Sequence, residues 1–364
     1  MAAPRLPGVS VVLPVYNGAD TLCRCLASLD AQDLPPEELG VVAVDDGSTD
    51  RSGELLDRYA LGRPNVQVIH HEASGGAGRP RNVGTDAAAG EFVFYIDADD
   101  ELAPEALGRI LAFAREHVSD LVVVGRMTLE RDVVFRPLQH PHVLADAPLR
   151  MAFSSLTPHK LVRRELLVRQ RIRFPERRVA WEDGIFLSRV APHARRISVL
   201  QDRAYYIKHR EPHRLSAGFR IRSKARSALE IVETLRRLQA DPVETDAIAA
   251  GLYRRLLRAW NSKRFLRLSR RTQELDVATM QRAGAALFRA SRDAELPRRL
   301  HLRSLAFRTG RVPVVAALAS WEQEHRWTAP LRHPVLLPTL ARAALGTARR
   351  ATARRDSSEG RPAN

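Results

Sequence analysis

The stretch GRPRNVGTDAAAGEFVFYIDADDEL, residues 78–102, holds a helix pattern, a buried strand and an acidic loop in direct succession. Pro80 stands where a first-turn proline is tolerated, so we predict a helix over residues 80–88. The apolar run 92–96 has the length of a buried strand, and the acidic sequence DADD follows it at 97–100. A helix joined to a continuous apolar strand is typical of a parallel sheet whose two faces are both covered by helices.

The same alternation of strand and helix extends through the first half of the chain. Apolar, β-branched runs predict further strands at 9–15, 41–44, 66–69 and 121–125. Helical spacing of apolar residues predicts helices at 19–31, 50–61 and 104–116. We therefore predict an α/β fold with a doubly wound, mostly parallel sheet over residues 1–218, in which the first strand lies between the second and the fourth.

After about residue 216 strand patterns become scarce and helical spacing prevails. Helices are predicted at 224–238, 246–268, 273–291 and 312–324. We expect an α-helical C-terminal domain at residues 219–345 and a basic, disordered tail at 346–364, where arginines stand among small polar residues. The apolar and arginine-containing run 334–350 fits a helix on an anionic membrane surface and a helix packed on the core equally well.

The chain is strongly basic. Its 58 Lys and Arg residues exceed its 42 Asp and Glu residues, which gives a formal net charge of +16 and a pI near 10.9. The resulting field attracts phosphates, anionic polymers, nucleic acid and acidic membrane surfaces. An arginine-rich coding composition explains the same charge without any partner.

Several classes of protein are excluded by pattern. No apolar stretch approaches the roughly 20 residues of a membrane-spanning helix, and the first residues have no secretory pattern. Cys23 and Cys25 form a C-R-C spacing that is neither a zinc knuckle nor a redox pair. We therefore expect a reduced, cytoplasmic chain without a transmembrane segment.

Acidic residues follow the second and fourth predicted strands. Asp45 and Asp46 end the second strand, whereas Asp97, Asp99 and Asp100 follow the fourth. In a doubly wound sheet these positions share one rim, so five carboxylates converge there and repel one another unless a metal or arginines compensate them. The D-x-D spacing of Asp97 and Asp99 suits Mg²⁺ or Mn²⁺ bound together with a diphosphate. The alternative is a loop that only caps the following helix.

A glycine-rich turn, residues 75–78, precedes Arg79 and Arg81. Glycines let a backbone approach a ligand closely, and the two arginines suit a phosphate or the acidic rim. The turn is not a P-loop, because G-K-[ST] is absent, and it lacks the third glycine of a dinucleotide fingerprint. A surface loop without a ligand is an equal alternative.

Four segments carry a family resemblance: VVLPVYNGADTL (11–22), VVAVDDGSTDRS (41–52), the stretch at 78–102, and WEDGIFLSRV (181–190). Their order and spacing resemble family 2 glycosyltransferases with the GT-A fold. The P-R-N version of the third segment is most similar to bacterial enzymes that glycosylate wall teichoic acid and related cell-surface polymers. The resemblance covers about residues 9–216 and is more specific for the fold and the reaction than for the sugar.

The resemblance implies a nucleotide site at the ends of the first two strands. Pro14, Tyr16 and Asn17 match the motif that lines the base and ribose pocket. Asp45 or Asp46 matches the acid that reads the uracil edge, and the sequence leaves open which of them does so.

The resemblance also implies diphosphate, metal and catalytic residues. Arg81 matches an arginine that approaches the nucleotide, Asp97 an acid near the ribose or metal, and Asp99 a direct metal ligand. Asp183 matches the general base of inverting members, although an acid there also stabilises the dipole of the helix that begins beside it. His209 matches a segment that contacts the diphosphate or metal, with an exposed basic loop as the alternative.

These observations predict an inverting, metal-dependent glycosyltransferase with Mn²⁺ or Mg²⁺ as cofactor and a UDP-sugar as donor. It would transfer a hexosyl or N-acetylhexosaminyl group to a hydroxyl of a cell-wall or cell-surface polymer such as teichoic acid. A lipid-linked or capsular saccharide is the alternative acceptor. A nucleic-acid-binding protein and an inactive transferase scaffold are the non-enzymatic alternatives, of which nucleic-acid binding is supported by charge alone.

The helical region fits three roles. Its periodicity is compatible with self-association into a homo-oligomer, with acceptor recognition, and with peripheral docking on the inner face of the cytoplasmic membrane.

Overall fold

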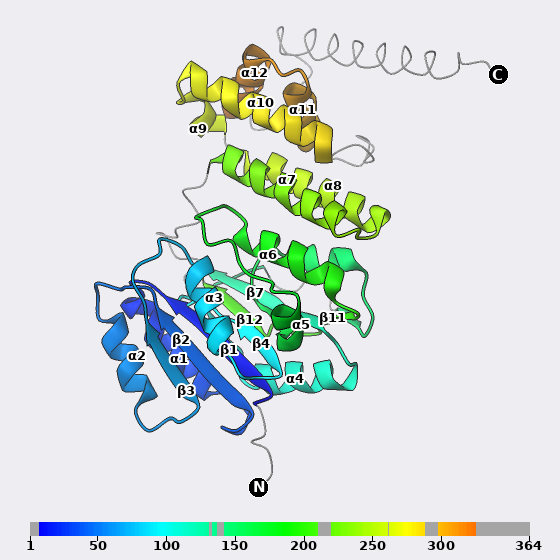
Figure 1. Ribbon diagram of the computed structural model, residues 1–364. Helices are drawn as coiled ribbons and strands as arrows, with labels where there is room; N and C mark the ends of the chain where they lie inside the picture. The colour runs from blue at the N-terminus through cyan, green and yellow to red at the C-terminus, as the bar shows by residue number, and fades with distance from the viewer. Residues whose placement is uncertain are drawn as a thin grey trace, which may run out of the picture. The chain divides into compact units, whose positions relative to one another are not determined.

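The computed structural model describes residues 7–130, 133–136, 142–209, 220–260, 262–287 and 298–324 (Figure 1). They divide into two compact units. The first contains the described residues up to 209 together with 233–244, and the second contains 220–232 and the described residues from 245 onward. The predicted tail at 346–364 and the run 334–350 lie outside the described residues.

The first unit contains an eight-stranded, mostly parallel sheet. Its strand order is β3-β2-β1-β4-β10-β6-β11-β9. The bounds are β1 (Val9–Val15), β2 (Leu39–Asp45), β3 (Val66–His70), β4 (Phe92–Tyr95), β6 (Leu121–Val124), β9 (His142–Leu144), β10 (Lys160–Arg163) and β11 (Ile197–Gln201). As predicted, β1 lies between β2 and β4 and is parallel to both.

Three strands of this sheet, β9, β10 and β11, were not predicted. β10 runs antiparallel to both of its neighbours, β4 and β6, and separates them. Its sequence KLVR is too short to show a strand period, so only its pairing identifies it.

A second, four-stranded sheet continues from the acidic loop. It has the order β5-β12-β7-β8, with β5 (Glu101–Leu102), β12 (Tyr206–His209), β7 (Arg126–Glu130) and β8 (Val133–Arg136). β5 begins directly after the acidic loop and pairs antiparallel with β12. The loop that follows β4 is therefore held between the two sheets.

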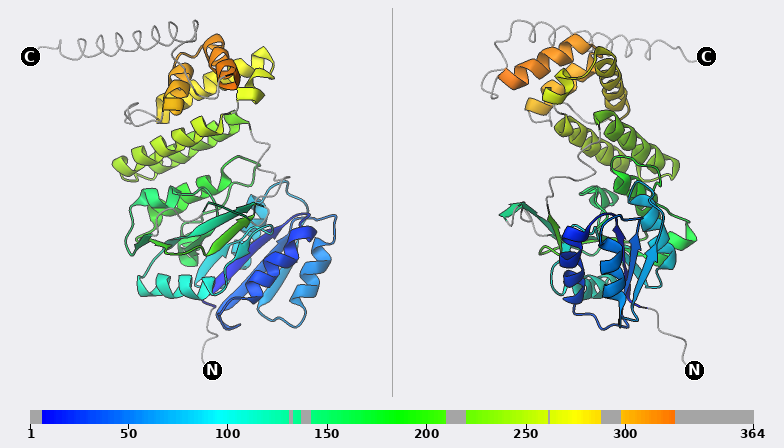
Figure 2. Two further views of the ribbon diagram at one scale, coloured as in Figure 1. Left: turned by 180° about the vertical axis from the view of Figure 1, so that it is seen from behind. Right: turned by 90° about the vertical axis from the view of Figure 1, so that its left-hand side faces the viewer.

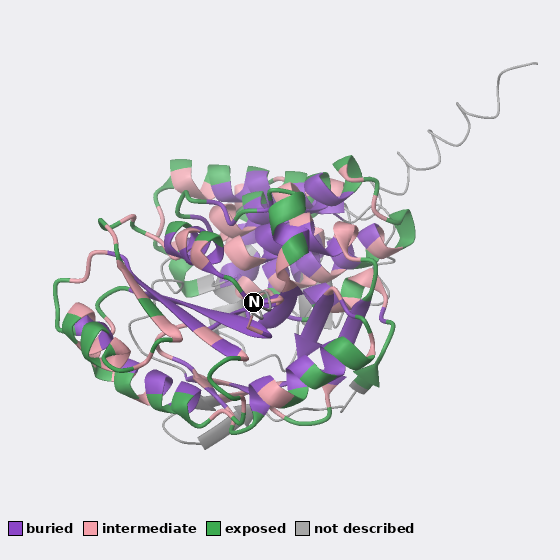
Figure 3. Cartoon of the chain, turned by 60° about the horizontal axis from the view of Figure 1, so that its bottom comes forward, coloured by how far each residue is buried: buried purple, intermediate pink, exposed green. Residues whose placement is uncertain are grey.

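Helices cover both faces of the large sheet (Figure 2). Successive side chains of β1 point to opposite faces of the sheet, and apolar residues on both faces need to be covered. Val9, Val11 and Leu13 point to the core cluster formed with α1 (Ala19–Asp30) and α4 (Ala106–Glu116). Val12 faces the other side, where α3 (Gly78–Ala87) approaches so closely that a Cβ on Gly84 would lie 2.5 Å from Val12 Cγ1. β1 is accordingly buried along its length, whereas the helices around the sheet carry exposed outer faces (Figure 3).

Three further α-helices lie in the first unit. α2 (Ser52–Ala60) follows β2, α5 (Arg164–Arg169) follows β10, and α6 (Glu182–Val190) packs on the face of the sheet that presents Tyr95. The rings of Tyr95 and Phe186 contact each other edge to face, with centroids 5.7 Å apart. Phe186 also stacks on Phe174 at 3.8 Å.

The second unit is helical, as predicted. It contains most of α7 (Ile221–Arg237) and α8 (Pro242–Ala259), followed by α9 (Ser262–Leu266), α10 (Arg270–Leu287), α11 (Arg298–Arg308) and α12 (Val312–Glu324).

Two details of the helical unit differ from the prediction. The single helix predicted over 246–268 is wrong, because α8 ends at Ala259 and a separate α9 begins at Ser262. Trp260, at this break, packs between Phe265 and Phe307, whose ring centroids lie 4.6 and 4.8 Å away. α11 was not predicted, since its apolar residues do not follow a 3.6-residue period.

Other expectations can be compared with the described residues. Cys23 is exposed and Cys25 is buried, and both are free thiols, as the C-R-C spacing predicts. Among the described helices none combines the length and the apolar character needed to cross a bilayer.

Candidate active site

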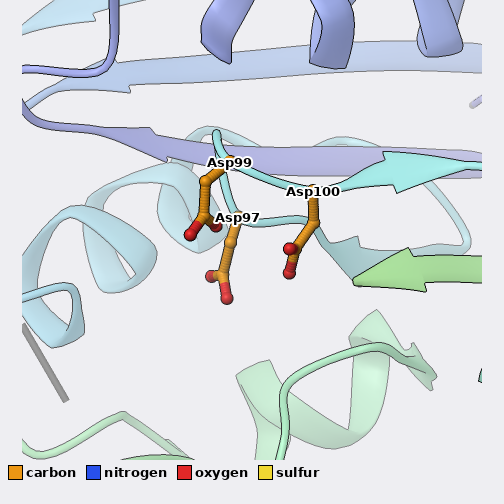
Figure 4. A group of neighbouring side chains, drawn as sticks. All are labelled: Asp97, Asp99 and Asp100. Atoms are coloured by element: carbon orange, nitrogen blue, oxygen red, sulfur yellow. The ribbon is translucent and has the colours of Figure 1, made fainter. Parts of the chain in front are cut away.

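The acidic loop after β4 brings three carboxylates together. Oxygen atoms of Asp97, Asp99 and Asp100 lie within 4.8 Å of one another, and Figure 4 shows the three side chains on the same side of the loop. Carboxylate oxygens are the ligands that Mg²⁺ and Mn²⁺ prefer. This donor set therefore fits the predicted divalent metal.

Asp100 fixes the loop to β12. Its carboxylate accepts hydrogen bonds from the Tyr206 hydroxyl at 2.8 Å and from the backbone N–H of His209 at 2.9 Å, and Lys208 Nζ lies 3.3 Å away. The backbone N–H of Asp97 donates in turn to the Tyr206 hydroxyl at 3.2 Å. Asp100 is fully buried and both of its oxygens are engaged, so its carboxylate is committed to β12.

Arg81 connects this loop to α6. Its Nη2 donates to Asp97 Oδ1 at 2.7 Å, while its Nη1 donates to Glu182 Oε1 and to Asp183 Oδ1, both at 2.9 Å. The Arg81 side chain is only 4% exposed, and its guanidinium lies over the ring of Phe174, 5.2 Å from the centroid. The structure thus places Arg81, which the resemblance assigns to the nucleotide, beneath three carboxylates.

The environment of Asp183 suits a general base. Burial raises the pKa of Asp183 to about 7, the Arg81 charge opposes this shift, and the neighbouring carboxylates of Glu182 and Asp97 add to it. Burial also raises the pKa of Glu182. A carboxylate with a pKa near neutral pH accepts a proton more readily than an ordinary aspartate, so the arrangement supports proton abstraction.

A fixed loop positions these acids. The Asn82 side chain accepts from the Phe174 N–H at 2.8 Å and donates to the Phe174 carbonyl at 3.1 Å, and it also donates to Glu176 Oε1. A Cβ on Gly78 would lie 2.1 Å from the Pro175 carbonyl oxygen, so the start of α3 needs glycine to pack against this loop. The loop that leads to α6 is therefore fastened to α3.

The predicted nucleotide pocket is built from two loops that bind each other. Asn17 adopts a left-handed conformation with φ of 48°. Its backbone N–H donates to Ser48 Oγ at 3.0 Å, and its side-chain oxygen accepts from the Thr49 N–H at 2.8 Å. Asp50 accepts from the first backbone N–H of α1, that of Ala19, and also from the first N–H of α2, that of Ser52. One carboxylate thus binds the first backbone N–H of both helices.

The other predicted pocket residues differ in exposure. Pro14 is buried within β1, whereas the ring of Tyr16 is 49% exposed at its end. Asp45 is buried and interacts with the Ser48 N–H and with His70 Nδ1, while buried Asp46 accepts from the N–H and the hydroxyl of Ser74. Both acids therefore have protein partners on different loops.

His209 lies beside the acidic loop and outside the carboxylate cluster. Its ring contacts Glu101, and its backbone binds Asp100. Among the described residues the cluster with metal-ligand spacing consists of Asp97, Asp99 and Asp100.

Three residues of the site were missed as functional candidates from the sequence. Glu182 shares Arg81 with Asp183, and Tyr206 and Lys208 bind the acidic loop. The signal for the last two is the segment YYIKH at 205–209, whose aromatic and β-branched residues are typical of a strand.

The acids at this site form ion pairs with cations from other elements. Arg24 pairs with Glu101, and Lys208 pairs with Asp97 and Asp100. Arg81 pairs with Asp97, Glu182 and Asp183.

Comparisons with known proteins agree with this arrangement. Residues 10–181 match the family described as "Glycosyl transferase family 2". The poly(ribitol-phosphate) beta-N-acetylglucosaminyltransferase TarS of Staphylococcus aureus is 36% identical over 217 residues, which cover 58% of this chain and 37% of that protein. The poly(ribitol-phosphate) beta-glucosyltransferase of Bacillus spizizenii is 36% identical over 200 residues, covering 54% of this chain and 32% of that protein. The matched region therefore spans about a third of the length of these curated relatives.

The structural comparison covers more of the chain. A crystal structure of S. aureus TarS 1-349 in complex with UDP-GlcNAc matches with a TM-score of 0.73 at 26% identity, covering 88% of this chain and 93% of that one. The predicted GT-A fold followed by a helical region is thereby confirmed.

Proposed function

This chain belongs to glycosyl transferase family 2 through residues 10–181, and from that premise we propose that it transfers a sugar from a UDP-sugar to a hydroxyl of an anionic cell-wall polymer, with inversion at the anomeric carbon. The observation that carries the proposal is that Asp97 and Asp183 bind the same guanidinium. Donor-side acids and a candidate base therefore share one small site. The similar proteins named for poly(ribitol-phosphate), and the similar structure with UDP-GlcNAc, support this choice of acceptor and donor class.

The donor side of the reaction is assigned to the acidic loop and the β1 end. Asp99 and Asp97 would hold Mg²⁺ or Mn²⁺, which when bound neutralises the charge that develops on the departing diphosphate. The exposed ring of Tyr16 offers a face on which the base stacks. Lys208 Nζ, 3.9 Å from Asp97 Oδ2, adds positive charge at the same end of the site.

The acceptor side is assigned to Asp183. As the acceptor hydroxyl oxygen bonds to the anomeric carbon, the bond from that carbon to the diphosphate oxygen breaks and the hydroxyl proton passes to the Asp183 carboxylate. Attack opposite the leaving group inverts the configuration in one step, so a single base suffices. Arg81 holds one carboxylate oxygen of Asp183 and leaves the other for the acceptor proton.

The pKa of Asp183 gives a pH prediction. Only the ionised carboxylate accepts a proton, so kcat/KM is expected to rise with pH through a limb centred at about pH 7 and then level off. Initial transfer rates at low donor and acceptor concentrations, measured from pH 5 to pH 9, would show this limb. A flat profile down to pH 5 would contradict the role of Asp183.

Arginines on the loop before α6 suit an anionic acceptor. Arg177 and Arg178 are exposed six and five residues before Asp183, on the loop that Asn82 and Gly78 hold against α3. Exposed Arg79 stands at the start of α3, and Arg178 Cα lies 4.0 Å from the position of a Cβ on Gly76. Guanidinium groups bind phosphate with paired hydrogen bonds, so this surface fits a polyol-phosphate chain.

Replacing Arg177 and Arg178 together by Ala is expected to raise the acceptor KM about tenfold, the order of a charge-assisted hydrogen bond, and to leave the donor KM within twofold. The salt dependence of the acceptor KM should weaken as well. Arg58→Ala, which removes an exposed arginine on α2, is the matched control and should change neither constant. An unchanged acceptor KM in the double variant would place acceptor recognition elsewhere.

The proposed function is tested by a transfer assay. The protein is incubated with Mn²⁺, radiolabelled UDP-GlcNAc or UDP-glucose, and poly(ribitol phosphate), and label in the polymer is measured. Label in the polymer supports the proposal, and NMR of the new glycosidic linkage reports inversion. Donor binding without transfer to this polymer, followed by transfer to a lipid-linked or capsular saccharide, would replace the acceptor and keep the chemistry. A cytoplasmic location, peripheral membrane contact and self-association stay predictions.

A further inference from the structure

The ion cluster around Arg81 has a specific geometry. The guanidinium uses one terminal nitrogen for Asp97 and the other for both acids of α6. Its Nε is buried and has no hydrogen-bond partner in the part of the chain that the structure describes. The side chain is therefore held entirely by three carboxylates and by the ring of Phe174 below it.

The two ends of this cluster belong to different halves of the reaction. Asp97 comes from the loop after β4, which carries the candidate metal ligands. Asp183 comes from the first turn of α6 and carries the assigned base. Because Arg81 binds Oδ1 of both acids, a change in charge at Asp97 reaches Asp183 through one intervening side chain.

We propose that Arg81 is a positioning residue that couples metal binding at the acidic loop to the orientation of Asp183. It competes with the metal for Asp97, and it holds the Asp183 carboxylate in place. This inference rests on the proposed function, because it assigns Asp183 as the base and Asp97 as a metal ligand. It predicts that loss of the Arg81 guanidinium raises the affinity for the metal and lowers turnover.

Competition at Asp97 follows from charge. A guanidinium 2.7 Å from Asp97 Oδ1 repels a divalent cation and occupies a ligand oxygen. Removing the guanidinium therefore strengthens Mn²⁺ binding to the protein alone. An arginine that only stabilised the fold would have no such effect, since its loss would loosen the acidic loop and weaken metal binding.

Orientation of Asp183 follows from the planar fork of arginine. Nη1 and Nη2 point at fixed angles to α6 and to the acidic loop, which a lysine ammonium cannot reproduce, although lysine keeps the charge. Arg81→Lys therefore separates the two contributions: the charge near Asp183 stays and the fixed orientation is lost. Arg81→Gln removes both.

The experiment measures three quantities on wild type, Arg81→Lys and Arg81→Gln. Free Mn²⁺ is titrated by electron paramagnetic resonance with the protein and Mn²⁺ alone, and kcat and the pH profile are measured in the transfer assay. Arg163→Lys is the matched control: Arg163 also binds two acids, Glu91 and Asp120, and lies over the ring of Phe92, at the opposite end of β4. In Arg163→Lys the Mn²⁺ affinity and kcat should stay within twofold of wild type, and the limb of the pH profile should not move.

We expect Arg81→Gln to bind Mn²⁺ three- to tenfold more tightly and to lose kcat by at least a hundredfold. The limb of its pH profile should move to higher pH, because the charge that favours ionised Asp183 is gone. Arg81→Lys should keep the wild-type limb and lose kcat by about tenfold.

Weaker Mn²⁺ binding in both variants, or a pH limb that Lys fails to preserve, would overturn the inference and leave Arg81 a buried ion-pair residue. If Arg81→Gln does not fold, the double variant with Glu182→Gln removes one of the carboxylates left unpaired, and Arg81→Lys alone still decides the orientation claim. Failure of the proposed function is a separate outcome, recognised because the wild-type protein itself would transfer no sugar.

Discussion

Asp183→Asn is expected to lower kcat for sugar transfer by about 10²–10⁴-fold, the usual contribution of a general base. The amide keeps the shape of the side chain and its contact with Arg81 but accepts no proton at neutral pH. Because Asp183 lies on α6 and not on the acidic loop, the affinity for UDP with Mn²⁺ should stay within a few fold of wild type. Rates and UDP binding by isothermal titration calorimetry test both parts.

Glu182→Gln is the natural companion to this variant. Glu182 binds the same nitrogen of Arg81 and precedes Asp183 in the same helical turn. If Asp183 is the base, Glu182→Gln should lower kcat by less than tenfold. Equal losses in the two variants, or lost UDP binding in Asp183→Asn, would refute the assignment.

Asp99→Ala is expected to abolish the stabilisation of the protein by UDP with Mn²⁺. Asp99 stands in the carboxylate cluster, and Asp100 is committed to Tyr206 and His209. A ligand at a hundred times its dissociation constant adds about 2.7 kcal/mol to the folded state, which corresponds to a rise in Tm of roughly 5 °C. Thermal melts of wild type and variant with UDP, GDP, dTDP or CMP, each with and without Mn²⁺, measure this rise.

The control for this experiment is Glu116→Ala, which removes a 69% exposed acid at the end of α4. It should keep the full rise in Tm. Stabilisation of Asp99→Ala by UDP equal to that of wild type would exclude Asp99 as a metal ligand. Stabilisation of wild type by a different nucleotide would change the donor class and keep the metal site.

Much of the fold was predictable because it depends on local pattern. The runs that became β1, β2, β3 and β4 are apolar and flanked by turn residues, and their order in the sheet follows from the handedness of the crossovers. The proximity of Asp97, Asp99 and Asp100 follows from their position after one buried strand. Each of these features can be predicted without knowing which distant parts of the sequence are in contact.

The remaining features depend on distant contacts. Arg81 binds Glu182 and Asp183, which lie about a hundred residues later, so its burial has no local signal. The short strand β10 is defined by its neighbours, and the break between α8 and α9 by the packing of Trp260. Helix periodicity continues across such a break and therefore does not reveal it.

The insertion of β10 between β4 and β6 also has a consequence for biosynthesis. As the chain leaves the ribosome, β1 to β4 find their partners among residues already made, whereas β6 has no neighbour in the sheet until residues 160–163 emerge. Asp183 follows about twenty residues later. The loops after β1 and β2, which form the predicted nucleotide pocket, can thus assemble before α6, which carries Asp183. A chain that stops short of β10 leaves β4 and β6 without the strand that joins them, and unpaired strand edges promote aggregation.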